Sequence, residues 1–375
     1  MTTSAKAPAP RDTNPYTRPR RSRWLGRAAL GLLGACLSVV LIGSAFFKPS
    51  LAAGQLSLTP RFTLGAWTAD LPTHLPWVAA FALLTAAIIP LRAVQWRHTL
   101  GERAPGFRHR YHSVAIGAFF HNAVPGKLGE FVRAFVLSRR QGLPFFESLG
   151  SVLVCKLLEL AALIAVVGVA LAGPLGSGAS SLGPAVLAAF GLFAVLLGLA
   201  LAGARYAGRL CAWLDSRGRL PKLSMALGHL GKGLGATKSP RRAVLAFAAS
   251  FGPVLASAIA YGVALQALGV EHGLFAGGIV LGAISLGQLS PGLPIGMGMY
   301  YLTSSWAARA LGAAPEQAAS FAALTHLATF STQLLVGLVS VLVYRIRLRQ
   351  LLRAKAEMVA ADAPTGPDPA LEPTR

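Results

Sequence analysis

The sequence has little charge and very few acids. Only 13% of its 375 residues are charged, and 35 Lys and Arg stand against 13 Asp and Glu, for a formal net charge of +22. A soluble domain carries about 25% charged residues, so the low share excludes an ordinary soluble fold. Hydrophobic residues make up 54% of the chain, which indicates lipid as the solvent.

Cysteine and histidine are also sparse, and neither shows a useful spacing. The three cysteines, Cys36, Cys155 and Cys211, are too widely separated for a disulfide framework, and we interpret them as packing residues. The eight histidines lack metal-ligand spacing, and the sequence has no phosphate-binding loop or nucleophile elbow. We therefore expect no metal, no cofactor and no catalytic residue.

Long apolar runs separate the basic segments. Six runs are long enough to cross a hydrocarbon core of about 30 Å at about 1.5 Å per residue. They are Ala28–Phe47, Leu75–Val94, Leu149–Leu171, Leu182–Ala202, Val244–Leu268 and Ala318–Tyr344. Pro and Gly interrupt two further apolar regions, Val114–Val136 and Leu274–Leu311. Because the basic residues lie between these apolar runs, the positive charge does not indicate a nucleic acid partner.

The basic residues also predict the topology. Residues 1–27, 92–110, 126–140, 204–242 and 345–375 hold 31 of the 35 Lys and Arg, and the positive-inside rule assigns all five segments to the cytoplasm. All five basic segments lie on the same side of the membrane only if both interrupted regions are re-entrant hairpins, which enter the membrane from opposite faces. We predict an all-α integral protein of a bacterial inner membrane, with about six spanning helices plus two re-entrant hairpins and both termini cytoplasmic.

The spans fall into two halves, residues 28–171 and 172–344, with the same order of elements. Three crossings separate equivalent points, so the second half is inverted, as in many secondary transporters. Residues 204–238 alternate basic and apolar positions, which favours an amphipathic helix on the anionic cytoplasmic surface. We expect residues 1–27 to be a disordered basic cytoplasmic tail and residues 345–375 to be a second cytoplasmic tail.

Polar and charged residues gather at the turn of the first hairpin. The candidate site residues are Asn122, Pro125, Lys127, Gly129, Glu130 and Arg133. If the helix resumes near Lys127, Glu130 and Arg133 share a face and can pair. A cationic helix N-terminus with Lys127 and Arg133 suits an anionic head group. The alternative is a neutralised pair that only anchors a helix at the interface.

Two more charges lie inside a predicted span. Lys156 and Glu159 are three residues apart, about 10 to 15 Å from the cytoplasmic end of the helix. Burying an unpaired charge costs several kcal/mol, so we expect both to face the bundle interior near Glu130. The alternative is that Lys156 reaches back to the interface. The second hairpin carries no charge, and its candidate residues are Pro291, Pro294, Gly296 and Tyr301.

These motifs resemble the lysylphosphatidylglycerol synthase transmembrane family, a flippase-like group of membrane proteins, over most of residues 75–345. The residues that match its first motif are Asn122, Pro125, Gly129, Glu130, Arg133, Gly142, Lys156 and Glu159. Those that match its second motif are Pro291, Pro294, Gly296, Gly298 and Tyr301. Tyr301 stands where the family usually has an acid, and Cys155 where it often has Glu.

The resemblance implies a protein that translocates or handles a lipid or lipid-linked molecule, with anionic lipids at its cytoplasmic face. We do not expect lipid aminoacylation, because the chain ends about 30 residues after its last predicted span. Two alternatives stay open. One is a membrane-embedded transferase or an accessory subunit of glycolipid or hopanoid biosynthesis, with Glu130 or Glu159 as a base. The other is a structural or regulatory membrane protein without transport. The sequence does not specify the oligomeric state.

Overall fold

Four long apolar helices dominate the computed structural model, which describes residues 36, 39–44, 46–52, 55–60, 71–123, 128–172, 240–270, 273–288 and 297–346 and scattered positions between 191 and 231. They are α3 (Leu71–Leu100), α6 (Phe145–Ala172), α9 (Pro240–Ala267) and α12 (Pro315–Val343), and each is long and apolar enough to cross a membrane. They match four of the six predicted spans, so the chain is a multi-pass membrane protein. The other two spans, and the amphipathic segment 204–238, lie largely outside the described residues.

The surface of these helices is apolar. Leu83 on α3 is 72% exposed and Leu335 on α12 is 60% exposed. Large apolar side chains exposed on long helices are expected where lipid replaces water. The outer faces of the long helices therefore carry aliphatic side chains that suit contact with lipid.

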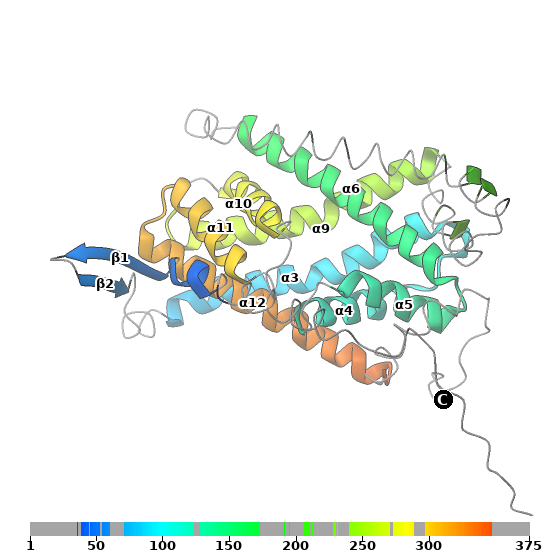
Figure 1. Cartoon of the computed structure of the whole chain (residues 1–375), viewed down its shortest axis with the longest axis horizontal. Helices are drawn as coiled ribbons and strands as arrows, with labels where there is room; N and C mark the ends of the chain where they lie inside the picture. Colours follow the sequence, from blue (N-terminus) through cyan, green and yellow to red (C-terminus); the bar gives the residue numbers. More distant parts are fainter. Residues whose placement is uncertain are drawn as a thin grey trace, which may run out of the picture.

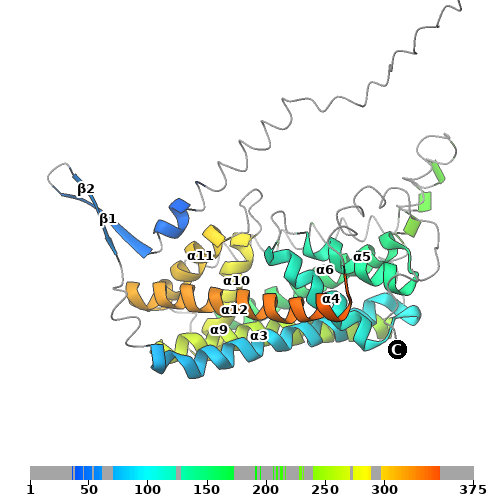
Figure 2. The same ribbon diagram turned by 90° about the horizontal axis from the view of Figure 1, so that it is seen from below.

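Each interrupted apolar region folds into two shorter helices. The first contains α4 (Phe107–Ala123) and α5 (Gly129–Gln141), and the second contains α10 (Gly273–Gln288) and α11 (Met297–Ala310). Figure 1 shows α4 and α5 toward one end of the long helices and α10 and α11 toward the other, and Figure 2 shows the same separation. Residues 124–127 and 289–296, which come between the two helices of each pair in the sequence, lie outside the described residues.

Polar contacts tie the ends of the long helices together. Past the end of α3, in the short 3₁₀ turn Gly101–Arg103, Glu102 pairs with Arg242 at the start of α9, with an N–O distance of 2.6 Å. At the opposite end, Gln317 of α12 donates to the carbonyl of Leu268, just past α9, at 2.9 Å. Helix α9 therefore runs in the direction opposite to both α3 and α12.

The two halves use the same set of helix contacts. In the first half, α3 and α5 each pack on both α4 and α6. In the second half, α9 and α11 each pack on both α10 and α12, which is the same pattern. Contacts between the halves also come in matching pairs. The contact of α4 with α12 corresponds to that of α10 with α6, and the contact of α3 with α12 corresponds to that of α9 with α6. Helices α3 and α9 pack on each other where the halves meet.

Glycines with positive φ follow equivalent helices. Gly101 (φ 74°) follows α3 and Gly269 (φ 81°) follows α9, while Gly142 (φ 62°) follows α5 and Gly312 (φ 96°) follows α11. Residues with a Cβ rarely adopt this conformation, so glycine is the usual residue at such helix ends.

A short antiparallel β-hairpin was not anticipated. Strands β1 (Phe47–Ala52) and β2 (Gln55–Pro60) pair between the first predicted span and α3. Leu56 and Leu58 alternate with Gln55, Ser57 and Thr59, the two-residue period of a strand.

Candidate functional site

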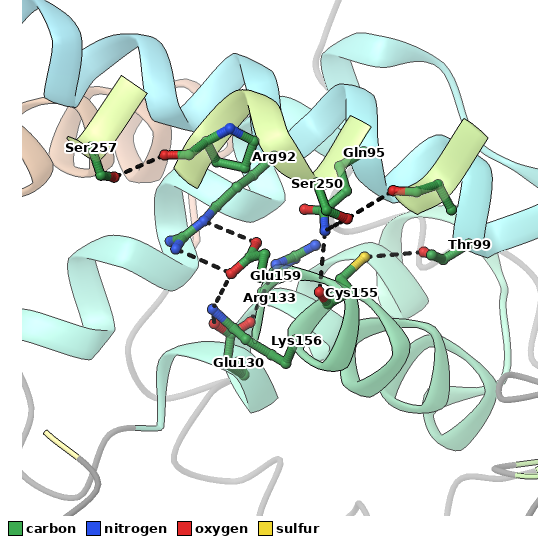
Figure 3. Close-up of polar contacts among 12 residues, drawn as sticks. Arg92, Gln95, Thr99, Glu130, Arg133, Cys155, Lys156, Glu159, Ser250 and Ser257 are labelled. Carbon is green, nitrogen blue, oxygen red and sulfur yellow. Dashed lines mark hydrogen bonds and ion pairs between the residues drawn. The ribbon is translucent and has the colours of Figure 1, made fainter. Parts of the chain in front are cut away.

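Five charged side chains form one connected cluster inside the bundle (Figure 3). Lys156 Nζ lies 2.8 Å from Glu130 Oε1 and 3.2 Å from Glu159 Oε2, so it bridges the two carboxylates. Arg92 of α3 reaches Glu159 at 3.2 Å, and Arg133 of α5 pairs with Glu130 at 3.3 Å. Among the described residues of the cluster, three cations against two carboxylates leave one positive charge in excess.

The position of Glu130 depends on a close helix crossing between α4 and α5. A Cβ added to Gly129 would lie 2.5 Å from the carbonyl oxygen of Gly117, and one added to Gly117 would lie 2.8 Å from that of Gly129. Both distances are shorter than those that real Cβ atoms show to neighbouring atoms, so the close crossing of α4 and α5 requires glycine on both helices. Glu130 follows immediately and faces α6.

Arg133 is almost completely buried, with 2% of its surface exposed. Its guanidinium carbon lies 4.2 Å from the ring centroid of Trp96, and the indole Nε1 donates to Ser151 Oγ at 2.9 Å. The ring face attracts the cation, and the indole hydrogen bond fixes the ring. Nonetheless Arg133 Nε and Nη2 have no hydrogen-bond acceptor within the described part of the chain.

Arg92 is the member of the cluster that the sequence analysis missed. The predicted span ended at Val94 and Arg92 was counted with the cytoplasmic basic residues, whereas α3 continues to Leu100. One turn later, Gln95 is fully buried and donates to the Cys155 carbonyl at 3.1 Å and to Ser250 Oγ at 2.9 Å. Two polar residues about one turn apart within an apolar helix, Arg92 and Gln95, were the available signal for an inward polar face.

The second half presents a neutral polar network. Tyr300 donates to Thr325 Oγ1 at 2.9 Å, and its hydroxyl lies 3.3 Å from that of Tyr261. The hydroxyl of the neighbouring Tyr301 lies 3.2 Å from His326 Nδ1. Hydroxyl and imidazole groups both donate and accept, so this network can serve hydrogen-bonding groups of either kind.

A cavity of about 290 Å³ connects the charged cluster with the neutral network. Residues from both halves line it, and Asn122 of α4 donates to Gln333 of α12 across it at 2.7 Å. Its polar lining comprises Thr85, Arg92, His121, Asn122, Glu130, Arg133, Lys156, Ser257, Tyr261, Ser285, Gln288, Tyr300, His326, Thr329 and Gln333. Aliphatic and aromatic residues such as Phe81, Ile88 and Leu281 complete it, so the cavity is amphipathic.

The structure brings together part of the candidate set. Glu130, Arg133, Lys156 and Glu159 form the cluster described above, and Asn122 and Gly129 lie beside it. Tyr301 lies apart, in the neutral network. Five other candidates fall outside the described residues: Pro125, Lys127, Pro291, Pro294 and Gly296.

The site does not have the arrangement of a metal centre. No group of three or more His, Cys, Asp or Glu able to hold a metal occurs in the described ranges. Glu130 contacts Lys156 and Arg133, and Glu159 contacts Arg92 and Lys156, so each carboxylate is paired with two cations.

Comparison with models of protein families gave a match over most of the chain. A family model described as "Lysylphosphatidylglycerol synthase TM region" matches residues 40–337, about four fifths of the chain. No match was found among curated proteins or among solved structures.

Proposed function

The chain belongs to the lysylphosphatidylglycerol synthase TM region family, and on that premise we propose that it translocates a lipid or lipid-linked molecule across the bacterial inner membrane without catalysing a reaction. The substrate head group occupies the cavity between the two halves, and the acyl chains stay in the bilayer. The observation that carries this proposal is an amphipathic cavity with an excess positive charge inside a membrane bundle. Charged residues inside a membrane are costly, and they usually mark a substrate pathway.

The proposed topology has six spans and two re-entrant hairpins in an inverted repeat. Paired helix contacts in the two halves, and paired glycines after equivalent helices, support it. Further support is the position of α4–α5 and α10–α11 toward opposite ends of the long helices. The end that holds Arg97, Arg139, Arg140 and Arg242 faces the cytoplasm in this proposal, in accord with the positive-inside rule.

An anionic head group is the occupant that the charge favours. Arg92, Arg133 and Lys156 line the cavity together with Glu130, while Glu159 lies behind them. An anion would neutralise the excess charge and accept from Arg133 Nε and Nη2, which have no acceptor among the described residues, whereas a cation would be repelled by three positive side chains. We propose translocation rather than a transferase reaction because Glu130 and Glu159, the two residues considered as its base, are each paired with two cations.

The test is transbilayer movement in proteoliposomes that contain fluorescent lipids with different head groups. We expect the wild-type protein to move an anionic lipid, and Glu130→Gln and Lys156→Ala to lose most of that movement. Glu102→Gln is the matched control, because its ion pair with Arg242 lies outside the cavity. Movement that persists in both cavity variants would contradict the assignment of the site.

A further inference from the structure

The first turn of α4 holds a buried arginine without a partner. Arg110 is 4% exposed, and its Nε and Nη1 atoms are enclosed and donate to no acceptor in the described part of the chain. No ion pair or ring contact joins it to another described residue. Burying a cation without a counter-charge is costly, so this position requires a physical explanation.

A second buried arginine shows what Arg110 lacks. Arg133 is 2% exposed, pairs with Glu130 at 3.3 Å and lies 4.2 Å from the ring centroid of Trp96. Its charge therefore meets both a carboxylate and an aromatic face. Arg110 meets neither among the described residues, so the group that would compensate its charge is an anion that the chain itself does not supply there.

The surroundings of Arg110 are positive as well. Arg97, in the last turn of α3, is close enough to repel Arg110, and both arginines act on His98. Helix α4 begins at Phe107, and the start of a helix carries partial positive charge. Glu102, in the intervening 3₁₀ turn, is held by Arg242 at 2.6 Å. The local field therefore attracts an anion from outside.

The position is accessible and separate from the cavity. Arg110 Nη2 is not enclosed with the other two nitrogens, and Arg97, Gly106 and Phe107 nearby are exposed. None of Arg97, His98 and Arg110 lines the cavity between the two halves. An anion can thus reach Arg110 from the end of the bundle that the proposed topology assigns to the cytoplasm.

We propose that the end of α3 and the start of α4 form a second anion site, which binds a phosphate group through Arg110 and Arg97. The paired N–H donors of a guanidinium match two phosphate oxygens, and two arginines balance the one or two negative charges of such a group. The phosphate belongs either to a soluble cytoplasmic ligand or to a lipid head group of the inner leaflet. This site lies outside the cavity, so it stands independently of the proposed function.

Phosphate-dependent thermal stability tests the site. The full chain is melted in an uncharged maltoside detergent with increasing inorganic phosphate at constant ionic strength. The wild-type melting temperature should rise and saturate, because phosphate binds the folded state. Arg110→Gln should weaken phosphate binding by about tenfold or more, the effect of losing charge-assisted hydrogen bonds. Arg309→Gln is the matched control, since Arg309 is exposed and lies on α11.

Stability without phosphate distinguishes a binding role of Arg110 from a structural one. In phosphate-free buffer Arg110→Gln should melt no lower than the wild type, because the variant no longer buries an unpaired cation. A lower melting temperature there would reveal a structural role and overturn the proposal. Arg97→Gln is a second variant, and it should weaken phosphate binding by about two- to fivefold because Arg97 is exposed.

Two kinds of nanodisc identify the source of the phosphate, one of phosphatidylcholine alone and one that also contains phosphatidic acid. A lipid ligand predicts that phosphatidic acid stabilises the wild type but not Arg110→Gln, and that added inorganic phosphate has no further effect. A soluble ligand predicts stabilisation by inorganic phosphate in both nanodiscs. The proposal is overturned if neither probe stabilises the wild type, if Arg110→Gln responds equally, or if the phosphate response is lost in Lys156→Ala instead.

Discussion

Removing the carboxylate of Glu159 should destabilise the protein, because it leaves Arg92 without its ion-pair partner. Its side chain is only 11% exposed and contacts both Arg92 and Lys156 at 3.2 Å. In Glu159→Gln, Lys156 keeps Glu130 at 2.8 Å, whereas Arg92 has no second carboxylate within ion-pair distance in the described part of the chain. The cost therefore comes mainly from Arg92.

Breaking a buried ion pair by removing one partner costs about 3–5 kcal/mol. The Arg92 side chain is 31% exposed, and water relieves part of the penalty, so we expect the lower end, about 3 kcal/mol. Removing both charges in Arg92→Gln/Glu159→Gln leaves no orphaned cation and should restore about 1–2 kcal/mol relative to Glu159→Gln. The measurement is the free energy of unfolding in detergent micelles, taken as a double-mutant cycle.

An exposed ion pair supplies the control for this cycle. Glu102 is 83% exposed in its pair with Arg242, so Glu102→Gln should change the free energy of unfolding by about 0–1 kcal/mol. The reasoning would be refuted if the changes in the free energy of unfolding caused by Arg92→Gln and Glu159→Gln were strictly additive. It would also be refuted if Glu159→Gln lowered that free energy no more than Glu102→Gln does.

Three further changes test the packing and the topology. Gly129→Ala forces a Cβ to 2.5 Å from the Gly117 carbonyl and should lower the free energy of unfolding by about 1–3 kcal/mol, whereas Gly106→Ala, with no atom closer than 3.9 Å, should not. Trp96→Phe loses the hydrogen bond to Ser151 and should cost about 1 kcal/mol, against no loss for the 50% exposed Trp306→Phe. The topology is tested with single cysteines at positions 102 and 316, introduced where Cys36 and Cys211 have been changed to Ser. Glu102→Cys should react with an impermeant thiol reagent only from the cytoplasm, and Glu316→Cys only from the periplasm. Reaction of both cysteines from the same side would contradict the inverted repeat.

Much of the helical framework was predictable, because helices in lipid need a continuous apolar stretch and leave a clear signal. Four predicted spans correspond to α3, α6, α9 and α12, with ends that differ by a few residues. Both interrupted regions are helix pairs, and Glu130 and Arg133 pair as their spacing indicated. The re-entrant entry of those pairs and the binding roles of the candidate residues stay predictions.

The parts that escaped prediction depend on tertiary contacts. Arg92 is 67 residues from Glu159 and sits at the edge of an apolar run, where hydropathy alone counts a charge as part of a loop. Tyr261 and Tyr300 carry no charge, and only the packing of α9 on α10 and α11 on α12 turns them into a polar lining. Long-range pairs of this kind have no periodic signature in a single sequence.

Head-group cross-linking tests the central claim most directly. The wild-type protein is reconstituted with phosphatidylglycerol that bears a photoreactive group on its glycerol, irradiated, and the labelled residues are mapped by mass spectrometry. The account predicts labels on cavity-lining residues of α5 and α12, such as those near Glu130 and His326, with the labels lost in Lys156→Ala. Labels confined to the lipid-facing surface around Leu83 and Leu335, or unchanged in Lys156→Ala, would contradict it.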